Sequence, residues 1–251
     1  MRVYTCAPTW DAMLTTIYEA FECKLGHENI KLMIDPVEQF TLFDEYIYVE
    51  SDKEKALKVV DAINKKISSY VYHQMAVTSM AYEEDVLDNI YHVLILGFNY
   101  GPDVLNMMQY KDVMRNYEIR KRVESEACRF KEFIRFHKIG DVYVAHIEPK
   151  SRIAEYLGPI FEDRMPSENF IIVDDVHFDA VVHYADEPFF MRKLDNIEYN
   201  KILNTEKIND EYTDLWRVFF NSIAIKERTN EKCQMLHFPK WTRVHAVEFM
   251  K

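Results

Sequence analysis

The stretch KRVESEACRFKEFIRFHKIGDVYVAHIE, residues 121–148, indicates the fold class because its hydrophobic period changes partway along. In the first half, apolar residues up to Ile134 recur every three or four positions, which is the spacing of one buried helix face. Apolar and polar residues then alternate on both sides of Gly140, and this pattern is typical of a β-hairpin over 134–139 and 142–148. A long helix that leads directly into paired strands predicts an α+β protein.

Both flanks of this stretch contain more helices than strands. Before it we expect a strand at 2–6, a helix from Thr9, an irregular segment around 30–43, a strand at 46–49, a helix capped by Ser51, and helices over 69–81 and 84–98. After it we expect a helix opened by Ser151, strands at 170–174, 179–184 and 189–194, and a last helix over 210–226 that packs into the core. These elements predict a helix-rich fold with a small antiparallel sheet covered by helices.

The length of 251 residues suits one domain over 1–251, or two intimate subdomains that divide at residue 110. In the second case, residues 1–110 are mainly helical and residues 111–251 are α+β. No run of about 18 apolar residues occurs, and Asp11 interrupts the start of the chain before a signal-peptide core could form. We therefore expect a cytoplasmic protein without membrane contact.

The four cysteines lie far apart and form no C-x-x-C pair, so we expect reduced thiols and neither a structural metal nor an iron–sulfur cofactor. The sequence also lacks the G-x-S-x-G, Walker, G-x-G-x-x-G and zinc-deaminase motifs. No cofactor is predicted, and the commonest routes to catalysis lose support.

The net charge of −11 opposes binding to a polyanion, but the charge is unevenly distributed. Residues 111–138 contain nine basic and five acidic side chains, and residues 217–251 contain seven basic and three acidic ones. Residues 1–110 and 139–216 are strongly acidic. Two basic segments in an acidic body would suit an anionic ligand that approaches one face of the protein.

Two segments carry a resemblance to a known family: RFKEFIRFHKIGDVYVAHIEPKSRIAEYLGPIFEDRMP (129–166) and LWRVFFNSIAIKERTNEKCQMLHFPK (215–240). Both resemble a bacterial family of unknown activity that is associated with DNA metabolism and DNA repair. Its genes are typically paired with a DNA-associated radical S-adenosylmethionine protein, and its members are sometimes fused to a uracil-DNA glycosylase domain. The resemblance implies DNA and a radical S-adenosylmethionine protein as partners, but it implies no mechanism.

Basic side chains of the two segments are the first candidates for a site. Arg122 and Arg129 are one heptad apart on the same helix side and could reach successive phosphates. The complete set of residues that we expect to contact nucleic acid is Arg122, Arg129, Arg135, His137, Arg217, Arg228 and Lys240. Alternatively, Glu124, Glu126 and Glu132 pair with the arginines on a solvated helix face.

Two further candidates concern acidic side chains. If the last helix continues beyond Ile223, Glu227 faces the core and could act as a general acid or base, or form a structural ion pair; if the helix ends first, Glu227 is left exposed. The hairpin DDVHFDAVVHY, residues 174–184, alternates Asp175, His177 and Asp179, a spacing that could hold a metal on one strand face. A turn among these residues breaks the alternation, so solvated turn charge is the better interpretation and no metal ligand is predicted.

The leading hypothesis is an accessory DNA repair or DNA metabolism protein that binds nucleic acid through the arginine-rich segments and acts with a radical S-adenosylmethionine partner. One rival is a stand-alone nuclease or base-processing hydrolase that uses Glu227. The other rival is a protein-binding scaffold that makes no contact with nucleic acid.

Overall fold

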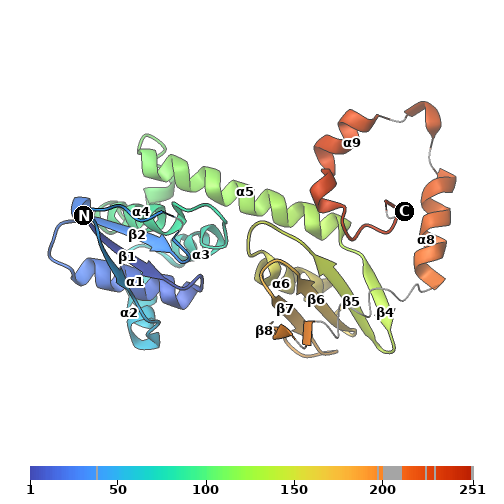
Figure 1. Cartoon of the computed structure of the whole chain (residues 1–251), viewed down its shortest axis with the longest axis horizontal. Helices are drawn as coiled ribbons and strands as arrows, with labels where there is room; N and C mark the ends of the chain where they lie inside the picture. Colours follow the sequence, from blue (N-terminus) through green and yellow to red (C-terminus); the bar gives the residue numbers. More distant parts are fainter. Residues whose placement is uncertain (38, 197, 200–210, 224, 229, 250–251) are drawn as a thin grey trace. The chain divides into compact units, whose positions relative to one another are not determined.

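The computed structural model describes residues 1–249 except 38, 197, 200–210, 224 and 229, and it omits the side chains of 211–213 and 226. The chain forms two compact units, Met1–Glu124 and Ser125–Lys251. The boundary between them lies inside one long helix, α5 (Lys111–Phe133), which is drawn in green in Figure 1. Each unit has its own β-sheet.

The sheet of the first unit is parallel and has the strand order β2-β1-β3. Its strands are β1 (Arg2–Cys6), β2 (Ile30–Ile34) and β3 (Glu45–Tyr48). Parallel neighbours need a crossover connection, and α1 (Trp10–Glu22) supplies the one between β1 and β2. The expectation of irregular structure from residue 30 is therefore wrong for β2, which pairs with β1 along its whole length.

Four helices of the first unit follow one another along the chain. They are α2 (Lys53–Lys66), α3 (Ser69–Thr78), α4 (Val86–Tyr100) and the first part of α5, with short 3₁₀ turns η1 (His27–Asn29) and η2 (Pro102–Asn106). The cap of α2 is Asp52 rather than the expected Ser51, because the Asp52 carboxylate accepts the first backbone N–H groups of the helix.

Helix α4 forms the interior of this unit. Ile90, Tyr91 and Leu94 are fully buried. Gly97 allows the close approach of Ile67, because a Cβ atom at this glycine would lie 2.7 Å from the Ile67 Cδ1 atom. The apolar periodicity of 84–98 thus correctly predicted a buried helix.

The sheet of the second unit is mixed and has the order β4-β5-β6-β7-β8. Its strands are β4 (Phe136–Ile139), β5 (Val142–Ile147), β6 (Asn169–Asp174), β7 (Asp179–His183) and β8 (Phe190–Lys193). The predicted hairpin is confirmed as β4 and β5, which pair antiparallel. β5 and β6 are parallel, since α6 (Ala154–Arg164) connects them. The α+β class is confirmed, although the sheets are not purely antiparallel.

The second half of α5 is held to its own unit by a buried carboxylate. Glu126 is only 5% exposed, and its oxygens accept the backbone N–H groups of Lys150 at 2.6 Å and Ser151 at 3.3 Å. Glu126 was expected on the polar face of the helix as a partner for arginines, and that expectation is wrong. Two loop N–H groups, of which that of Ser151 is buried, use this carboxylate as their acceptor.

The C-terminal part comprises α8 (Glu211–Ile223), η3 (Lys226–Arg228), α9 (Glu231–His237) and η4 (Lys240–Thr242). The expectation that the last long helix packs its apolar face into the core is wrong. Leu215, Phe219 and Ile223 are 63%, 52% and 57% exposed. The contacts of α8 include those of Phe220 with Phe249 and of Trp216 with Arg135. Amphipathic spacing predicts a helix, but it does not determine what covers the apolar face.

Among the described residues, no helix combines the length and the apolar character needed to span a membrane.

Candidate functional site

A hollow of about 430 Å³ lies between β4 and α8 in the second unit, and we call it the aromatic pocket. It is lined by Arg135, Phe136, His137, Leu215, Trp216, Phe219 and Val247. The pocket therefore combines a mainly apolar lining with one guanidinium and one imidazole. Trp216 is 37% exposed and Phe219 is 52% exposed, so solvent reaches both rings.

Arg135 is fixed in this pocket by a two-point ion pair. Its Nη2 atom lies 2.6 Å from Oε1 of Glu248, and its Nε atom lies 3.3 Å from Oε2. The Glu248 side chain is only 3% exposed, whereas that of Arg135 is 21% exposed. The guanidinium also lies over the Trp216 ring, 5.2 Å from its centre. The ion pair thus neutralises Arg135 and orients it against an aromatic surface.

The two basic segments meet at this pocket. Arg217 donates from Nε to the carbonyl oxygen of Val247 at 3.1 Å and lies 3.3 Å from an oxygen of Asp214. Val247 also lines the aromatic pocket, together with Arg135 and His137. Three of the predicted contact residues are therefore close to this pocket: His137 on β4, Arg135 just before β4, and Arg217 on α8. Carboxylates accompany both arginines, so the predicted cluster of free positive charge is not formed.

The other predicted contact residues lie elsewhere. Arg122 belongs to the first unit, where it forms an ion pair with Glu83 at 2.8 Å. Arg129 is partly exposed in the second unit, and Arg228 and Lys240 are exposed there. Within the described part of the chain, these last three cations form no ion pair or hydrogen bond through their side chains.

Glu227 does not occupy the environment that its proposed catalytic role required. Helix α8 ends at Ile223, and Glu227 lies in the 3₁₀ turn η3 with its side chain exposed. The core-facing position depended on one more turn of α-helix. In the residues that the structure describes, Glu227 has no ion-pair partner, so it has neither the burial nor the neighbour that would tune a catalytic carboxyl group.

A second polar group gathers where the parallel strands β5 and β6 end, and we call it the carboxylate–histidine cluster. It consists of Glu148, Asp175 and His245. The Nε2 atom of His245 lies 3.2 Å from Oε1 of Glu148 and 3.5 Å from Oδ2 of Asp175. Each carboxylate comes directly after a strand, and the neighbouring strand ends bring the two side chains to the same edge of the sheet.

His146 supports this cluster from β5. Its ring is buried, with 1% of the side chain exposed, and its Nδ1 atom lies 3.0 and 3.1 Å from the two oxygens of Asp175. The rings of His146 and His245 are 5.7 Å apart. Asp175, which is 7% exposed, is thus held by two imidazoles.

The remaining polar side chains of the 174–184 hairpin do not join the cluster. Asp174 is fully buried, accepts the backbone N–H of His177 and contacts the His177 ring at 2.7 Å. Asp179 forms ion pairs with Arg152 and Lys193. The predicted break in the alternation is present, but the interpretation as solvated turn charge is wrong for the buried Asp174 and Asp175.

Glu148 and His245 are the residues that sequence reasoning did not select. The Ile147-Glu148-Pro149 piece belonged to the family resemblance, and a carboxylate that directly follows a buried strand was the only local signal for a site. His245 is 97 positions away from Glu148 in the sequence, so no local pattern could associate them.

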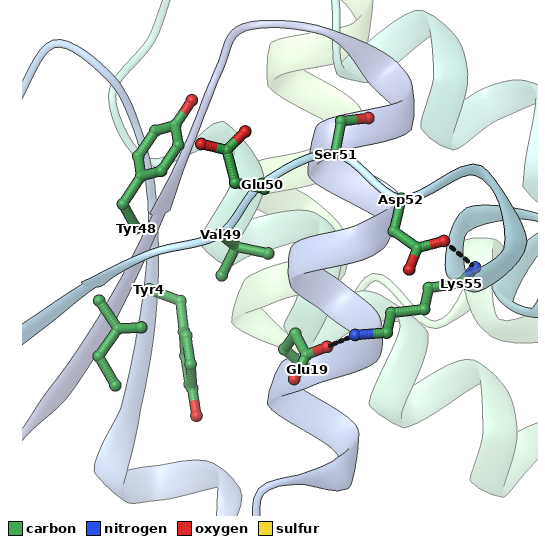
Figure 2. A pocket seen from close by; sticks show the side chains of 9 residues that line it. Tyr4, Glu19, Tyr48, Val49, Glu50, Ser51, Asp52 and Lys55 are labelled. Atoms are coloured by element: carbon green, nitrogen blue, oxygen red, sulfur yellow. Dashed lines mark hydrogen bonds and ion pairs between the residues drawn. The ribbon is translucent and has the colours of Figure 1, made fainter.

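A hollow of about 600 Å³ in the first unit is larger than the aromatic pocket, and most of its charged lining residues are acidic (Figure 2). Its lining includes Glu19, Glu50 and Asp52, against the single cation Lys55. The Lys55 Nζ atom lies 2.6 Å from the Glu19 carboxylate and is neutralised by it. Figure 2 marks this contact with a dashed line. An anionic ligand would be repelled here, so this hollow is not a phosphate site.

The fold and the sites define an α+β protein with a polar strand-end cluster and an aromatic pocket in its second unit. A family model with the description "Domain of unknown function (DUF4130)" matches residues 84–248, about two thirds of the chain. The chain belongs to this family. No curated protein matches the sequence.

Proposed function

We propose that this protein binds single-stranded nucleic acid and that an unpaired base stacks in the aromatic pocket. The observation that carries the proposal is Trp216, a partly exposed indole at the edge of an apolar hollow, with the Arg135 guanidinium over its ring. Every base has a flat π-face, and stacking on an aromatic side chain contributes about 1–3 kcal/mol per base. A duplex would not offer such a face without extruding a base.

The phosphates would be contacted by cations that no described carboxylate neutralises. Arg129, Arg228 and Lys240 have solvent-accessible side chains in the same unit as the pocket, and none forms an ion pair with a described residue. Arg135 and Arg217 would orient the base and the C-terminal segment rather than supply net positive charge, because acidic neighbours accompany them. The acidic stretches 1–110 and 139–216 would disfavour phosphate contact away from these cations.

The resemblance supplies the biological context of the proposal. It supports DNA as the nucleic acid, DNA repair or DNA metabolism as the process, and a radical S-adenosylmethionine protein as the partner. The chemistry of the pocket is compatible with DNA and RNA alike, since stacking does not involve the sugar.

The test is the affinity for a fluorescently labelled oligonucleotide, measured by anisotropy at low and moderate salt. We expect Trp216→Ala to weaken binding roughly 5- to 150-fold, which corresponds to the loss of one stacked base. Phe43→Ala is the matched control, because Phe43 is a 92% exposed aromatic side chain of the first unit. Each of Arg129→Ala, Arg228→Ala and Lys240→Ala should lower the slope of log affinity against log salt by about 0.7. Unchanged affinity of Trp216→Ala at low salt refutes the proposal.

The exposed apolar face of α8 favours a second candidate function, the docking of a protein partner. Val218, 68% exposed, lies on this face but does not line the aromatic pocket. Contiguous exposed apolar side chains are typical of protein interfaces. Co-purification of the radical S-adenosylmethionine protein after nuclease treatment, retained at high salt and lost in Val218→Asp, would support docking. Trp216→Ala and Val218→Asp therefore separate the two functions.

A further inference from the structure

We infer that the carboxylate–histidine cluster of Glu148, Asp175 and His245 is a binding site for a divalent transition-metal ion. This inference does not rest on the proposed function, because none of the three side chains lines the aromatic pocket. Three features of the cluster carry it: the separation of the ligand atoms, the local charge, and the neighbouring His146.

The separations fit a shared ion. The three candidate ligand atoms all lie within 4.8 Å of one another, and His245 lies 3.2 and 3.5 Å from the two carboxylates. Carboxylate oxygens and imidazole nitrogens bind such ions at about 2.0–2.2 Å, so two ligands of one ion stand roughly 3–4 Å apart. The side chains need only small rotations to converge on one point.

The local charge also calls for a cation. Two carboxylates stand beside one another, and within the described part of the chain neither forms an ion pair with a lysine or an arginine. Asp175 is 7% exposed, and a buried carboxylate without a compensating charge is costly. A bound divalent ion would supply that charge and would replace the imidazole contacts of His245 with coordination.

His146 provides the support that metal ligands usually have. A ligating carboxylate is commonly oriented by a hydrogen bond from an outer residue, and His146 donates from Nδ1 to Asp175 in the tautomer that this geometry favours. Its Nε2 atom is buried and has no hydrogen-bond partner among the described residues. With Nδ1 directed at Asp175 and no other described hydrogen-bond partner, the ring serves to orient that carboxylate.

The ligand set selects the kind of ion. Two carboxylates and one imidazole suit Mn²⁺ or Zn²⁺, whereas Ca²⁺ prefers six to eight oxygen ligands and soft ions prefer thiolates. Three protein ligands leave at least one coordination position to water, which is the arrangement of a reactive rather than a purely structural site. The partly exposed Glu148 side chain, at 41%, gives solvent access from one side.

The experiment is a titration of the full chain, freed of metals by chelation, with Mn²⁺ followed by electron paramagnetic resonance and with Zn²⁺ followed by calorimetry. We expect one equivalent to bind. Glu148→Gln, Asp175→Asn and His245→Gln should each weaken binding by more than about 100-fold, and His146→Gln, a positioning change, by about 10- to 100-fold. Glu155→Gln and His237→Gln are matched controls, because both side chains are exposed in the same unit and belong to no cluster.

The inference is overturned if neither ion binds saturably, or if Glu148→Gln binds as tightly as the native chain. Glu148 is partly exposed, so this variant should fold, and circular dichroism verifies that it does. Trp216→Ala should retain the metal, while Glu148→Gln should retain oligonucleotide affinity in the presence of chelator. Failure of the metal site and failure of the nucleic-acid proposal are thereby told apart.

Discussion

Replacement of Arg135 is expected to destabilise the second unit strongly, because it leaves the buried Glu248 carboxylate without its ion-pair partner. Glu248 is 3% exposed, and Arg135 donates to both of its carboxylate oxygens, at 2.6 and 3.3 Å. Removing one partner of a buried pair typically costs about 3–5 kcal/mol. Arg135 is itself 21% exposed, so water can enter the vacated space, and we expect the lower end of that range. Loss of the guanidinium from the Trp216 ring adds about 0.5–1 kcal/mol.

The assay is urea unfolding of Arg135→Met, followed by tryptophan fluorescence in a Trp10→Phe background. Emission then comes from Trp216 and Trp241, which both belong to the second unit. The double variant Arg135→Met with Glu248→Leu should recover most of the loss, because no unpaired charge remains inside.

Arg192→Ala is the control, since its ion pair with Glu198 is solvent-exposed and should contribute less than about 1 kcal/mol. The reasoning is refuted if the free energy of unfolding of Arg135→Met lies within about 1 kcal/mol of that of the native chain, because an exposed ion pair would contribute that little. It is equally refuted if the double variant is no more stable than the single one.

Three further predictions concern other parts of the chain. Glu126→Ala should lower the free energy of unfolding by about 2–5 kcal/mol in urea titrations, because two backbone N–H groups lose their acceptor, whereas Glu126→Gln, which keeps one oxygen, should lose less. Burial raises the pKa of the Cys6 thiol to about 11, so at pH 8 a disulfide reagent should modify the exposed Cys128 rapidly and Cys6 only after unfolding; equal rates would contradict the buried position. The hydrogen bonds from Arg115 hold the pKa of the Asp85 carboxyl below its usual range. The ionised carboxylate therefore stabilises the fold above its unfolded-state pKa, and this stability is lost as the pH falls through the folded-state pKa. Asp85→Asn should be less stable near neutral pH, and its acid unfolding should depend less on pH below about 5, the region where aspartates protonate.

Local periodicity predicted most individual elements. The apolar stripe before Ile134 and the alternation around Gly140 correctly gave a long helix and a hairpin, because each pattern spans several turns or residue pairs. The strand β2 was missed because its pairing partner is β1, 28 positions earlier. Parallel pairing depends on contacts that are distant in the sequence, and a short segment carries little trace of them.

The candidate sites were predicted only in part, because they too depend on contacts between residues that are distant in the sequence. Arg135 and Arg217 were selected for their charge and do meet at Val247 and Glu248, but the carboxylates that neutralise them could not be foreseen. The cluster of Glu148 and His245 depends on the register of β5 against β6 and on the course of the C-terminal segment. Neither is encoded in the spacing of nearby residues, so the chemistry at the strand ends became visible only in three dimensions.

The family match and the folded units divide the chain at different places. The match starts at residue 84 and so takes α4 without the sheet beside it, although Asp88 accepts the backbone N–H of Leu32 on β2 at 2.9 Å. A recombinant fragment trimmed to the matched residues would leave this carboxylate without its donor and would open the interior around Tyr91 to water. Such a fragment should aggregate, so a soluble version of the family segment has to retain the N-terminal strands that the match omits.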